Sequence, residues 1–525
     1  MKLTVLLLKS SVDVFDDALR DGHGLDEVSL KKEIGDESAL FVRQPHSNPP
    51  KWAAFLQPAT VGTLTLANAS SAAVLFVRKG DRRLAYTFGH GRNALNPESI
   101  EPRFGLKVAL NTMDANRLRS ADTRMLGDDV RTKRVQTSGL VDQTAFEFDT
   151  SRDLLRQISG VPSSDSLAKK VIGSDSLTLH ANVTASGLGE KSQQLIDAFA
   201  SNKYRDQFEW IDHLAPVTDP SRRAELDKRL VEALSKGSLD RMHLAATSVV
   251  DWDEVEDFKI DGTRGTVFPD LDLDAYVAAH SDIAAVSLER LKSQKVKVRF
   301  SGNDNYTPRG SVYLSLVWET KVGNTVYALV DGSWYAVDAD YAEKVRRSVG
   351  AVPNPRADHL PETTTSESEG DYNERAANES SQLFLLDKKL VKPAGAATRI
   401  EFCDLFSKDK QLIHVKRKTS SATLSHLFAQ GTVAAELFLQ DPEVRKQVRE
   451  TIRLEAPRSG FLQHVPEARP TASDYEVVYA IAAKPNANWP LSLPFFSQIN
   501  LMASCQRLAA MGFSYALTLV EANDS

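Results

Sequence analysis

Residues 400–418, with the sequence IEFCDLFSKDKQLIHVKRK, decide the fold of the C-terminal part of the chain. Two runs of strand length, 400–406 and 412–418, contain apolar residues and flank the polar residues 407–410. Runs of this kind on either side of a short polar turn predict a β-hairpin.

The second run of the hairpin places different side chains on its two faces. His414 and Lys416 are two positions apart, so they are expected on one face of the strand. Ile413 and Val415 then point to the other face, toward a core. An imidazole and an amine beside Asp404 of the neighbouring strand are costly to place for structure alone. These residues are therefore the first candidates for a functional site.

Elements predicted on both sides of the hairpin give its order in the chain. Residues 371–377 open a helix and residues 383–391 form a strand. From 420 to 440, apolar residues recur close to helical spacing. The predicted order is helix, strand, strand with Asp404, strand with Lys416, helix. The elements expected after it are helices at 443–452 and 493–511 and strands at 475–482 and 513–520.

This order resembles the core of the PD-(D/E)XK nuclease superfamily. There, an Asp on one strand and a (Glu/Asp)-x-Lys motif on the next hold a divalent metal ion and an attacking water. The resemblance implies a restriction-endonuclease-like α/β domain at the C-terminus of an otherwise mixed α+β chain. It also implies that Asp404 binds the metal and that Lys416 positions or activates the water.

His414 stands where the superfamily usually has an acid, which leaves three alternatives. In the first, Glu401, Asp387 or Glu374 completes the site. In the second, Asp404 and His414 bind a metal other than Mg²⁺, because imidazole suits Mn²⁺ or Zn²⁺ better. In the third, the site has lost cleavage and only binds. The expected cofactor is a divalent ion, Mg²⁺ or Mn²⁺, and the candidate catalytic residues are Asp404, His414, Lys416, Glu401 and Glu374.

Three functions remain open for these residues. In the first, the protein is a metal-dependent phosphodiesterase, in which the ion polarises the scissile phosphate and Lys416 stabilises the developing charge. In the second, the same basic region binds nucleic acid without cutting it. In the third, Lys416 and His414 protect a solvent-facing edge strand against aggregation. The candidate nucleic-acid contacts are Lys408, Lys410, Arg417, Lys418, Gln430 and His426.

The composition is that of an ordinary soluble globular protein, and 525 residues are enough for two or three domains. The net charge of −6 argues against a protein coated in nucleic acid and leaves room for a local basic groove.

Two cysteines, Cys403 and Cys505, form neither a disulfide framework nor a four-ligand zinc site, so a reducing cytoplasm is expected. Residues 1–9 are interpreted as a first strand and not as a secretory signal, and no apolar run predicts a transmembrane helix.

Residues 1–150 are expected to form a β-rich domain. Its clearest element is a hairpin over residues 74–88. The glycine-rich residues 88–92 (FGHGR) follow directly. One interpretation is a backbone cradle for phosphate or nucleic acid, and the other is a glycine turn at the end of the hairpin. In the first interpretation the charge is supplied by Arg92, Arg103 and Lys107.

Residues 151–350 are expected to form a mixed α+β domain, separate from the first or continuous with it. A helix is predicted to open at 149–156, and a hairpin at 325–337 has an Asp-Gly turn. Trp334 and Tyr335 of that hairpin are candidates for base stacking or for the core. Residues 351–370 have three prolines and a Thr/Ser/Glu run, which predicts a linker or mobile loop before a C-terminal domain at 371–525.

The whole chain also resembles a sporadically distributed, uncharacterised bacterial family, over stretches that include 88–92, 331–335, 401–404 and 414–417. The patchy distribution of such a family suggests cargo of mobile elements or of phage defence. We therefore expect a cytoplasmic defence nuclease in which residues 1–350 recognise a target. The alternative is a nucleic-acid- or protein-binding module with a degenerate nuclease-like domain. Nucleic acid is the expected partner, a membrane is not, and a homo-oligomer or partner protein is compatible with the sequence.

Overall fold

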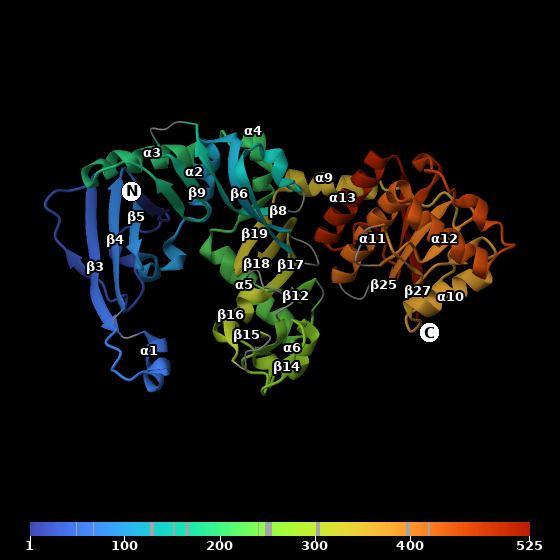
Figure 1. Cartoon of the computed structure of the whole chain (residues 1–525), viewed down its shortest axis with the longest axis horizontal. Helices are drawn as coiled ribbons and strands as arrows, with labels where there is room; N and C mark the ends of the chain where they lie inside the picture. The colour runs from blue at the N-terminus through green and yellow to red at the C-terminus, as the bar shows by residue number, and fades with distance from the viewer. Residues whose placement is uncertain are drawn as a thin grey trace. The chain divides into compact units, whose positions relative to one another are not determined.

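The structure, a computed structural model, describes the chain except residues 49, 67, 126–130, 151–152, 164–166, 240, 247–254, 301–304, 395–398, 418–420 and 525. It divides into two compact units. Unit 1 comprises Met1–Arg124 and Thr132–Ile211, and unit 2 comprises Met125–Arg131 and Asp212–Ser525. Helices and strands are mixed in both, and the N-terminal region is rich in strands, so the predicted α+β class is confirmed (Figure 1). The predicted boundaries at 150 and at 351–370 stay predictions.

A ten-stranded sheet with the order β2-β3-β4-β5-β1-β10-β9-β8-β6-β7 forms the centre of unit 1. Its strands are β1 (Lys2–Leu7), β2 (Asp26–Val28), β3 (Glu37–Asn48), β4 (Asn68–Lys79), β5 (Arg82–Gly89), β6 (Met113–Met125), β7 (Arg131–Val141), β8 (Asp153–Pro162), β9 (Lys170–Gly173) and β10 (Leu177–His180). The helices are α1 (Lys51–Leu56), α2 (Phe104–Thr112), α3 (Leu188–Ala200) and α4 (Arg205–Phe208). Helices α2 and α3 pack on one face, in a core that includes Leu3, Val5 and Leu7 of β1. Leu6 of β1 belongs to a second core on the other face.

Two predictions for this region have opposite outcomes. The hairpin over 74–88 is confirmed, since β4 and β5 pair antiparallel with Arg78 opposite Arg83. The helix predicted at 149–156 is wrong, because residues from Asp153 onward form β8. Leu154, Leu155 and Ile158 are buried there, so pairing and packing within the sheet outweigh the local helical preference.

The first part of unit 2 contains two antiparallel sheets, ordered β11-β19-β18-β17-β12 and β14-β13-β15-β16. Their strands are β11 (Leu214–Pro216), β12 (Met242–Leu244), β13 (Val255–Ile260), β14 (Val267–Phe268), β15 (Lys295–Phe300), β16 (Thr307–Ser311), β17 (Leu316–Val322), β18 (Thr325–Val330) and β19 (Ser333–Val337). The helices are α5 (Pro220–Ser235), α6 (Leu273–Ala279), α7 (Leu288–Ser293), α8 (Val312–Ser315) and α9 (Ala339–Gly350).

The predicted hairpin with the Asp-Gly turn is confirmed in this part. Strands β18 and β19 pair antiparallel around Asp331 (φ 51°) and Gly332 (φ 68°), the two left-handed positions that a tight hairpin turn requires. Trp334 and Tyr335 are both buried, and Trp334 Nε1 donates a hydrogen bond to Asp227 Oδ1 (2.8 Å). Both aromatic residues therefore belong to the core and not to a base-stacking surface.

The C-terminal part of unit 2 is a sheet between helices, with strand order β20-β27-β26-β25-β24-β21. Its elements are α10 (Glu369–Glu379), β20 (Thr363–Thr364), β21 (Leu383–Leu385), β24 (Leu405–Ser407), β25 (Gln411–Arg417), α11 (Ser421–Gln440), α12 (Pro442–Glu455), β26 (Glu476–Ala483), α13 (Phe495–Met511) and β27 (Ser514–Asn523). A small separate ladder joins β22 (Leu390–Val391) and β23 (Ile400–Glu401). Strands β21, β24 and β25 are successively antiparallel, whereas β25, β26 and β27 are parallel. The predicted order of helices and strands is confirmed, except that the predicted strand over 383–391 is divided into β21 and β22, and the predicted strand over 400–406 is divided into β23 and β24 with Asp404 between them (Figure 1).

Helices cover both faces of this sheet. On one face, Tyr372 of α10 packs in a core with Ile413 and Val415 of β25. On the other face, α11 contacts β25, β26 and α13, and its Phe428 meets Tyr479 of β26 edge to face. Strand β25 is therefore a central strand with both faces covered, and the edge-strand interpretation of His414 and Lys416 is wrong.

Residues 352–370, predicted as a linker or mobile loop, are hydrogen bonded to the same sheet. Arg356 N donates to Glu476 Oε2 (3.0 Å), and Gln411 Nε2 donates to Ala357 O (2.9 Å). The short strand β20 within this stretch pairs in parallel with β27. Backbone and side-chain hydrogen bonds thus hold this stretch against the sheet although it buries few apolar side chains.

Glu319 connects two parts of unit 2. Its buried carboxylate, on β17, accepts hydrogen bonds from Phe495 N (2.7 Å) and Phe496 N (3.0 Å) in the first turn of α13. Amides in the first turn of a helix lack partners within the helix, and a negative charge there is favourable. The five-stranded sheet therefore caps a helix of the C-terminal part.

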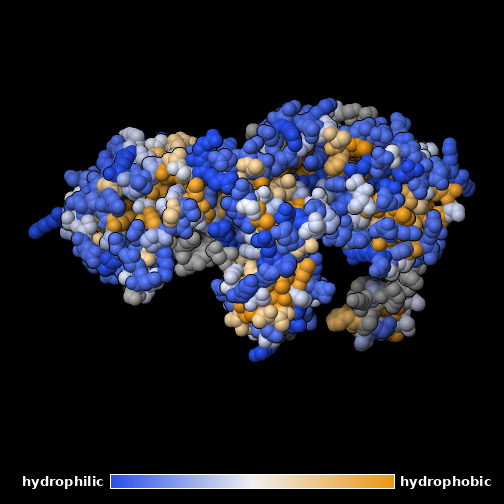
Figure 2. All heavy atoms as spheres, turned by 180° about the vertical axis from the view of Figure 1, so that it is seen from behind, coloured by the Kyte–Doolittle hydropathy of each residue, from blue (hydrophilic) through white to orange (hydrophobic). Residues whose placement is uncertain are grey.

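The surface is mostly polar on the side that Figure 2 shows. Hydrophilic residues cover most of this side, and hydrophobic residues appear among them in separate groups. Within the described ranges, no helix is long and apolar enough to cross a membrane.

Candidate metal centre

Asp404 is held between two strands by its own backbone. Its amide donates to Ile413 O of β25 (3.0 Å), and its carbonyl accepts from Leu386 N (2.8 Å) and Asp387 N (2.9 Å) after β21. Its side chain is also fixed, because Oδ2 accepts a hydrogen bond from Val415 N (2.7 Å). The hairpin that the sequence predicts therefore orients this carboxylate rigidly at the start of β24.

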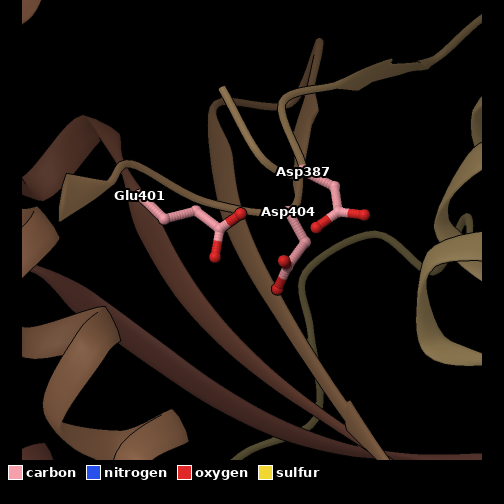
Figure 3. Close-up of side chains that lie close together, drawn as sticks. All are labelled: Asp387, Glu401 and Asp404. Atoms are coloured by element: carbon pink, nitrogen blue, oxygen red, sulfur yellow. The ribbon is translucent and has the colours of Figure 1, made fainter. Parts of the chain in front are cut away.

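Two more carboxylates converge on Asp404. One ligand oxygen from each of Asp387, Glu401 and Asp404 lies within 4.8 Å of the other two. We call these three residues the acidic cluster (Figure 3). Asp387 follows β21, Glu401 ends β23 and Asp404 precedes β24, so three short segments bring them together. Among the described residues, no histidine or cysteine joins this group.

Burial and mutual repulsion make the acidic cluster electrostatically unfavourable without a counter-ion. The pKa of Asp404 is raised to about 8, mainly by burial and also by the charges of Glu401, Asp387 and Glu369, whereas the hydrogen bond from Val415 N opposes the shift. Burial, followed by Asp387, also raises the pKa of Glu401, which the Lys388 amide and the Lys416 charge oppose. A cation between these carboxylates would relieve both effects.

Lys416 lies at the edge of the cluster in an ion pair. Its Nζ is 2.8 Å from Glu369 Oε1, and Glu369 Oε2 accepts a hydrogen bond from Arg417 N (3.2 Å). Both side chains of the pair are partly buried. Because Glu369 is the first residue of α10, the helix end positions the ammonium group of Lys416.

The donor set of the cluster fits a hard divalent cation. Three carboxylates offer only oxygen, the ligand that Mg²⁺ prefers and Mn²⁺ accepts. Of the alternatives that the sequence leaves open, the structure places Glu401 and Asp387 beside Asp404. Glu374 is exposed on α10, outside the cluster.

His414 lies on the other side of β25 from the α10 core. Its ring is buried, 6.5 Å between centroids from the ring of Tyr479, and Nε2 has no hydrogen-bond partner among the described residues. Burial lowers the pKa of His414 to about 4, so the imidazole is neutral near pH 7. The structure therefore does not bring His414 to the carboxylates, and the predicted Asp404–His414 ligand pair is not formed.

The predicted nucleic-acid contacts are dispersed. Arg417 donates to Thr364 O (2.8 Å) and Thr365 O (2.9 Å), while Gln430 is exposed on α11. Lys418 and the side chain of His426 lie outside the described residues. Lys410 pairs with Asp474 (3.1 Å) at the start of β25, and Lys416 is six residues further, about 20 Å along an extended strand. The lysines of the turn, Lys408 and Lys410, therefore form no continuous patch with Lys416.

Sequence reasoning missed Glu369 and named Asp387 only as an alternative. Ser368 caps α10 by accepting from Asp371 N (3.2 Å), so the Ser-Glu-Gly-Asp run marks a helix start. That signal places Glu369 in a first turn but does not say which strand it meets. Asp387 follows a strand by two residues, which is the position where side chains gather at a sheet edge.

The comparisons with known proteins give a family and nothing more specific. A model of a family of unknown function, DUF6119, matches residues 3–521. Neither a curated protein nor a solved structure matches the chain.

Proposed function

The chain belongs to DUF6119, a family of unknown function, and from the geometry of the acidic cluster we propose that it is a metal-dependent phosphodiesterase that cuts nucleic acid. The observation that carries the proposal is the convergence of Asp387, Glu401 and Asp404 within 4.8 Å, with a lysine at its edge. Carboxylates that converge at a partly buried place repel one another, and titratable groups perturbed in this way are typical of functional sites.

The order of elements supports the same proposal. Asp404 directly precedes β24, which pairs with β25, the strand of Lys416, and both strands follow α10 and β21 and precede α11. This is the order on which the resemblance to PD-(D/E)XK nucleases rests. In place of the second acid of that motif, Glu401 and Asp387 supply carboxylates from β23 and from the segment after β21, which removes the need for His414 as a ligand.

Each residue has a role that its position allows. Asp387, Glu401 and Asp404 would hold a divalent ion, which supplies Lewis-acid polarisation of a phosphoryl oxygen and a more acidic water. Lys416 donates hydrogen bonds to oxygen atoms on which negative charge develops during phosphodiester hydrolysis. Glu369 fixes the direction of the Lys416 side chain through their ion pair.

Cleavage of a mixed panel of DNA and RNA in Mg²⁺ or Mn²⁺ tests the proposal. The wild type is compared with Lys416→Ala and with a matched control, Lys228→Ala, which removes an exposed lysine of α5. Metal-dependent cutting that Lys416→Ala abolishes and Lys228→Ala retains, with the same circular dichroism spectrum, supports the phosphodiesterase and names its substrate.

The alternative function is a module that binds nucleic acid or protein through a degenerate nuclease-like domain. Its signature is salt-sensitive binding that Lys416→Ala weakens, without cutting in any metal. If the wild type neither cuts nor binds the panel, the phosphodiesterase and the nucleic-acid-binding module are both contradicted, and binding of a protein is the alternative left.

A further inference from the structure

A cavity of about 510 Å³ opens on the sheet of unit 1. Side chains from five neighbouring strands line it, on β5, β1, β10, β9 and β8. We call it the threonine cavity, after Thr4, Thr87 and Thr178, which lie on three adjacent strands. Its volume is within the range of cavities that hold small-molecule ligands, about 300–1,000 Å³.

The register of the sheet aligns the three threonines. Thr4 of β1 is paired with Thr87 of β5 on one side and with Thr178 of β10 on the other. The hydroxyl oxygens of Thr4 and Thr178 are 3.4 Å apart. Because Leu3 and Val5 point into the core beneath α2 and α3, Thr4 faces the opposite side of the sheet. Three hydroxyl groups therefore form a row across the floor of the cavity.

Among the described residues, two cationic side chains line the cavity and no acidic one does. Lys2 is two residues before Thr4, on the same face of β1. Arg92 donates from Nη1 to Ser176 Oγ (3.2 Å), a neutral partner that also lines the cavity. Neither cation forms an ion pair within the part of the chain that the structure describes. The lining is thus positively charged and rich in hydrogen-bond donors.

The glycine-rich residues 88–92 place Arg92 at this cavity. A Cβ on Gly89 would lie 2.3 Å from Ser71 O, and one on Gly91 would lie 2.1 Å from Ala73 O. Both glycines therefore allow the chain to cross the backbone of β4 after β5 ends. Of the charges expected for a phosphate cradle, Arg103 donates to Ile211 O (2.9 Å) and Lys107 lies over the rings of Phe199 and Tyr204, so Arg92 alone reaches the cavity.

We propose that the threonine cavity binds a phosphate group. A guanidinium group matches two phosphate oxygens with paired donors, and an ammonium group adds a compact charge. Hydroxyl groups and the amide of Gln157 satisfy the remaining oxygen atoms, and the absence of acids from the lining avoids repulsion. The phosphate belongs either to a free nucleotide or to a nucleic-acid strand, which share this chemistry. This proposal does not depend on the acidic cluster, which lies in unit 2.

Binding measurements without divalent metal test the proposal. The full-length chain is titrated in EDTA with ADP and, separately, with a fluorescently labelled single-stranded DNA, so that no cation bound in unit 2 contributes. Arg92→Gln and Lys2→Gln each remove one charge of the lining, and Gln157→Glu adds a carboxylate. Lys32→Gln removes an exposed lysine of unit 1 that does not line the cavity and serves as the matched control.

The expected result is a dissociation constant that rises by about tenfold or more in Arg92→Gln and Gln157→Glu, and stays within about twofold in Lys32→Gln. If the effect is seen with ADP, the source of the phosphate is a free nucleotide. If it is seen with the strand alone, the source is nucleic acid. Absence of binding of either probe to the wild type, or equal binding by wild type, Arg92→Gln and Gln157→Glu, overturns the proposal.

Discussion

The ammonium group of Lys416 lies 2.8 Å from Oε1 of Glu369. This ion pair joins β25 to the first residue of α10. Arg417 N donates to the other oxygen of the same carboxylate (3.2 Å). Glu369 therefore holds two consecutive residues of β25 in place beside the acidic cluster.

This pair gives a graded expectation for catalysis. Lys416→Ala removes the donor and should lower kcat by about 10²–10³-fold. Glu369→Gln keeps Lys416 but removes the charge that orients its side chain. It should therefore lower kcat less, by about tenfold, and leave the KM for the nucleic-acid substrate nearly unchanged. Single-turnover cleavage by both variants measures the difference. A Glu369→Gln loss as large as that of Lys416→Ala would contradict the positioning role.

Metal affinity should depend on pH through Asp404. Its pKa is raised from 3.8 to about 8, so the free protein carries a proton there at neutral pH, and a cation must displace it. Affinity should therefore increase as the pH rises toward about 8 and then level off, with release of up to one proton per ion. Calorimetric titration with Mn²⁺ in buffers of different ionisation enthalpy measures the released proton. Asp404→Asn should lose the metal affinity itself, and an affinity that is flat below pH 8 in the wild type would contradict the assignment.

The same shift predicts the stability of the metal-free protein. A carboxyl group whose pKa is raised by folding contributes stability below its unfolded pKa and loses it as the pH rises through the folded value. As the pH rises from the unfolded pKa of 3.8 to about 8, Asp404 should therefore contribute progressively less stability to the metal-free wild type, and Asp404→Asn should lack this decrease. Thermal unfolding in EDTA across this range compares the two, and Glu450→Gln, an exposed carboxyl of α12, is the control. Parallel pH profiles of wild type and Asp404→Asn would contradict the shift.

His414 should make the fold sensitive to acid. Folding lowers its pKa from 6.5 to about 4, so its contribution to stability is present above the unfolded value and is lost as the pH falls through the folded one. His414→Leu should reduce the decrease in the free energy of unfolding at acid pH by about 1–3 kcal/mol. Denaturant unfolding at several pH values measures it, with His180→Gln, an exposed histidine of β10, as the control. An acid limb unchanged in His414→Leu would show that the imidazole is not buried and neutral.

Glu319→Ala should destabilise the first turn of α13. The change leaves the amides of Phe495 and Phe496 without their buried acceptor, at a cost of about 1–3 kcal/mol. Faster hydrogen exchange at these two amides, measured by mass spectrometry, is the expected result. Glu319→Gln retains one carbonyl acceptor and should give a smaller increase. Exchange equal to wild type in both variants would mean that other groups cap the helix.

The sequence was sufficient for the parts of the site that depend on local pattern. Polar residues between two strand-length runs predict the β24–β25 hairpin, and the hairpin alone brings Asp404 beside β25. The sequence offers Glu401, Asp387 and Glu374 as acids that complete the site, and the structure brings the first two of them beside Asp404. The Asp-Gly hairpin at β18–β19 was predictable for the same reason, since its turn chemistry is local.

The placement of His414 could not be derived from strand alternation. Alternation separates two faces, but it identifies a solvent face only when one side of a sheet is uncovered. Strand β25 has α10 on one face and α11 on the other, so His414 is buried although it alternates with core residues. Glu369 was missed because its partner lies 47 residues away, and that pairing depends on how α10 packs on the sheet.

The central claim is that Asp387, Glu401 and Asp404 together hold a divalent ion. A crystal of the full-length protein grown with Mn²⁺, measured at the manganese absorption edge, tests it most directly, with Asp404→Asn crystals as the comparison. The account predicts an anomalous peak bounded by these three carboxylates in the wild type and its loss in the variant. A wild-type peak at other residues, or no peak at saturating Mn²⁺, would contradict it.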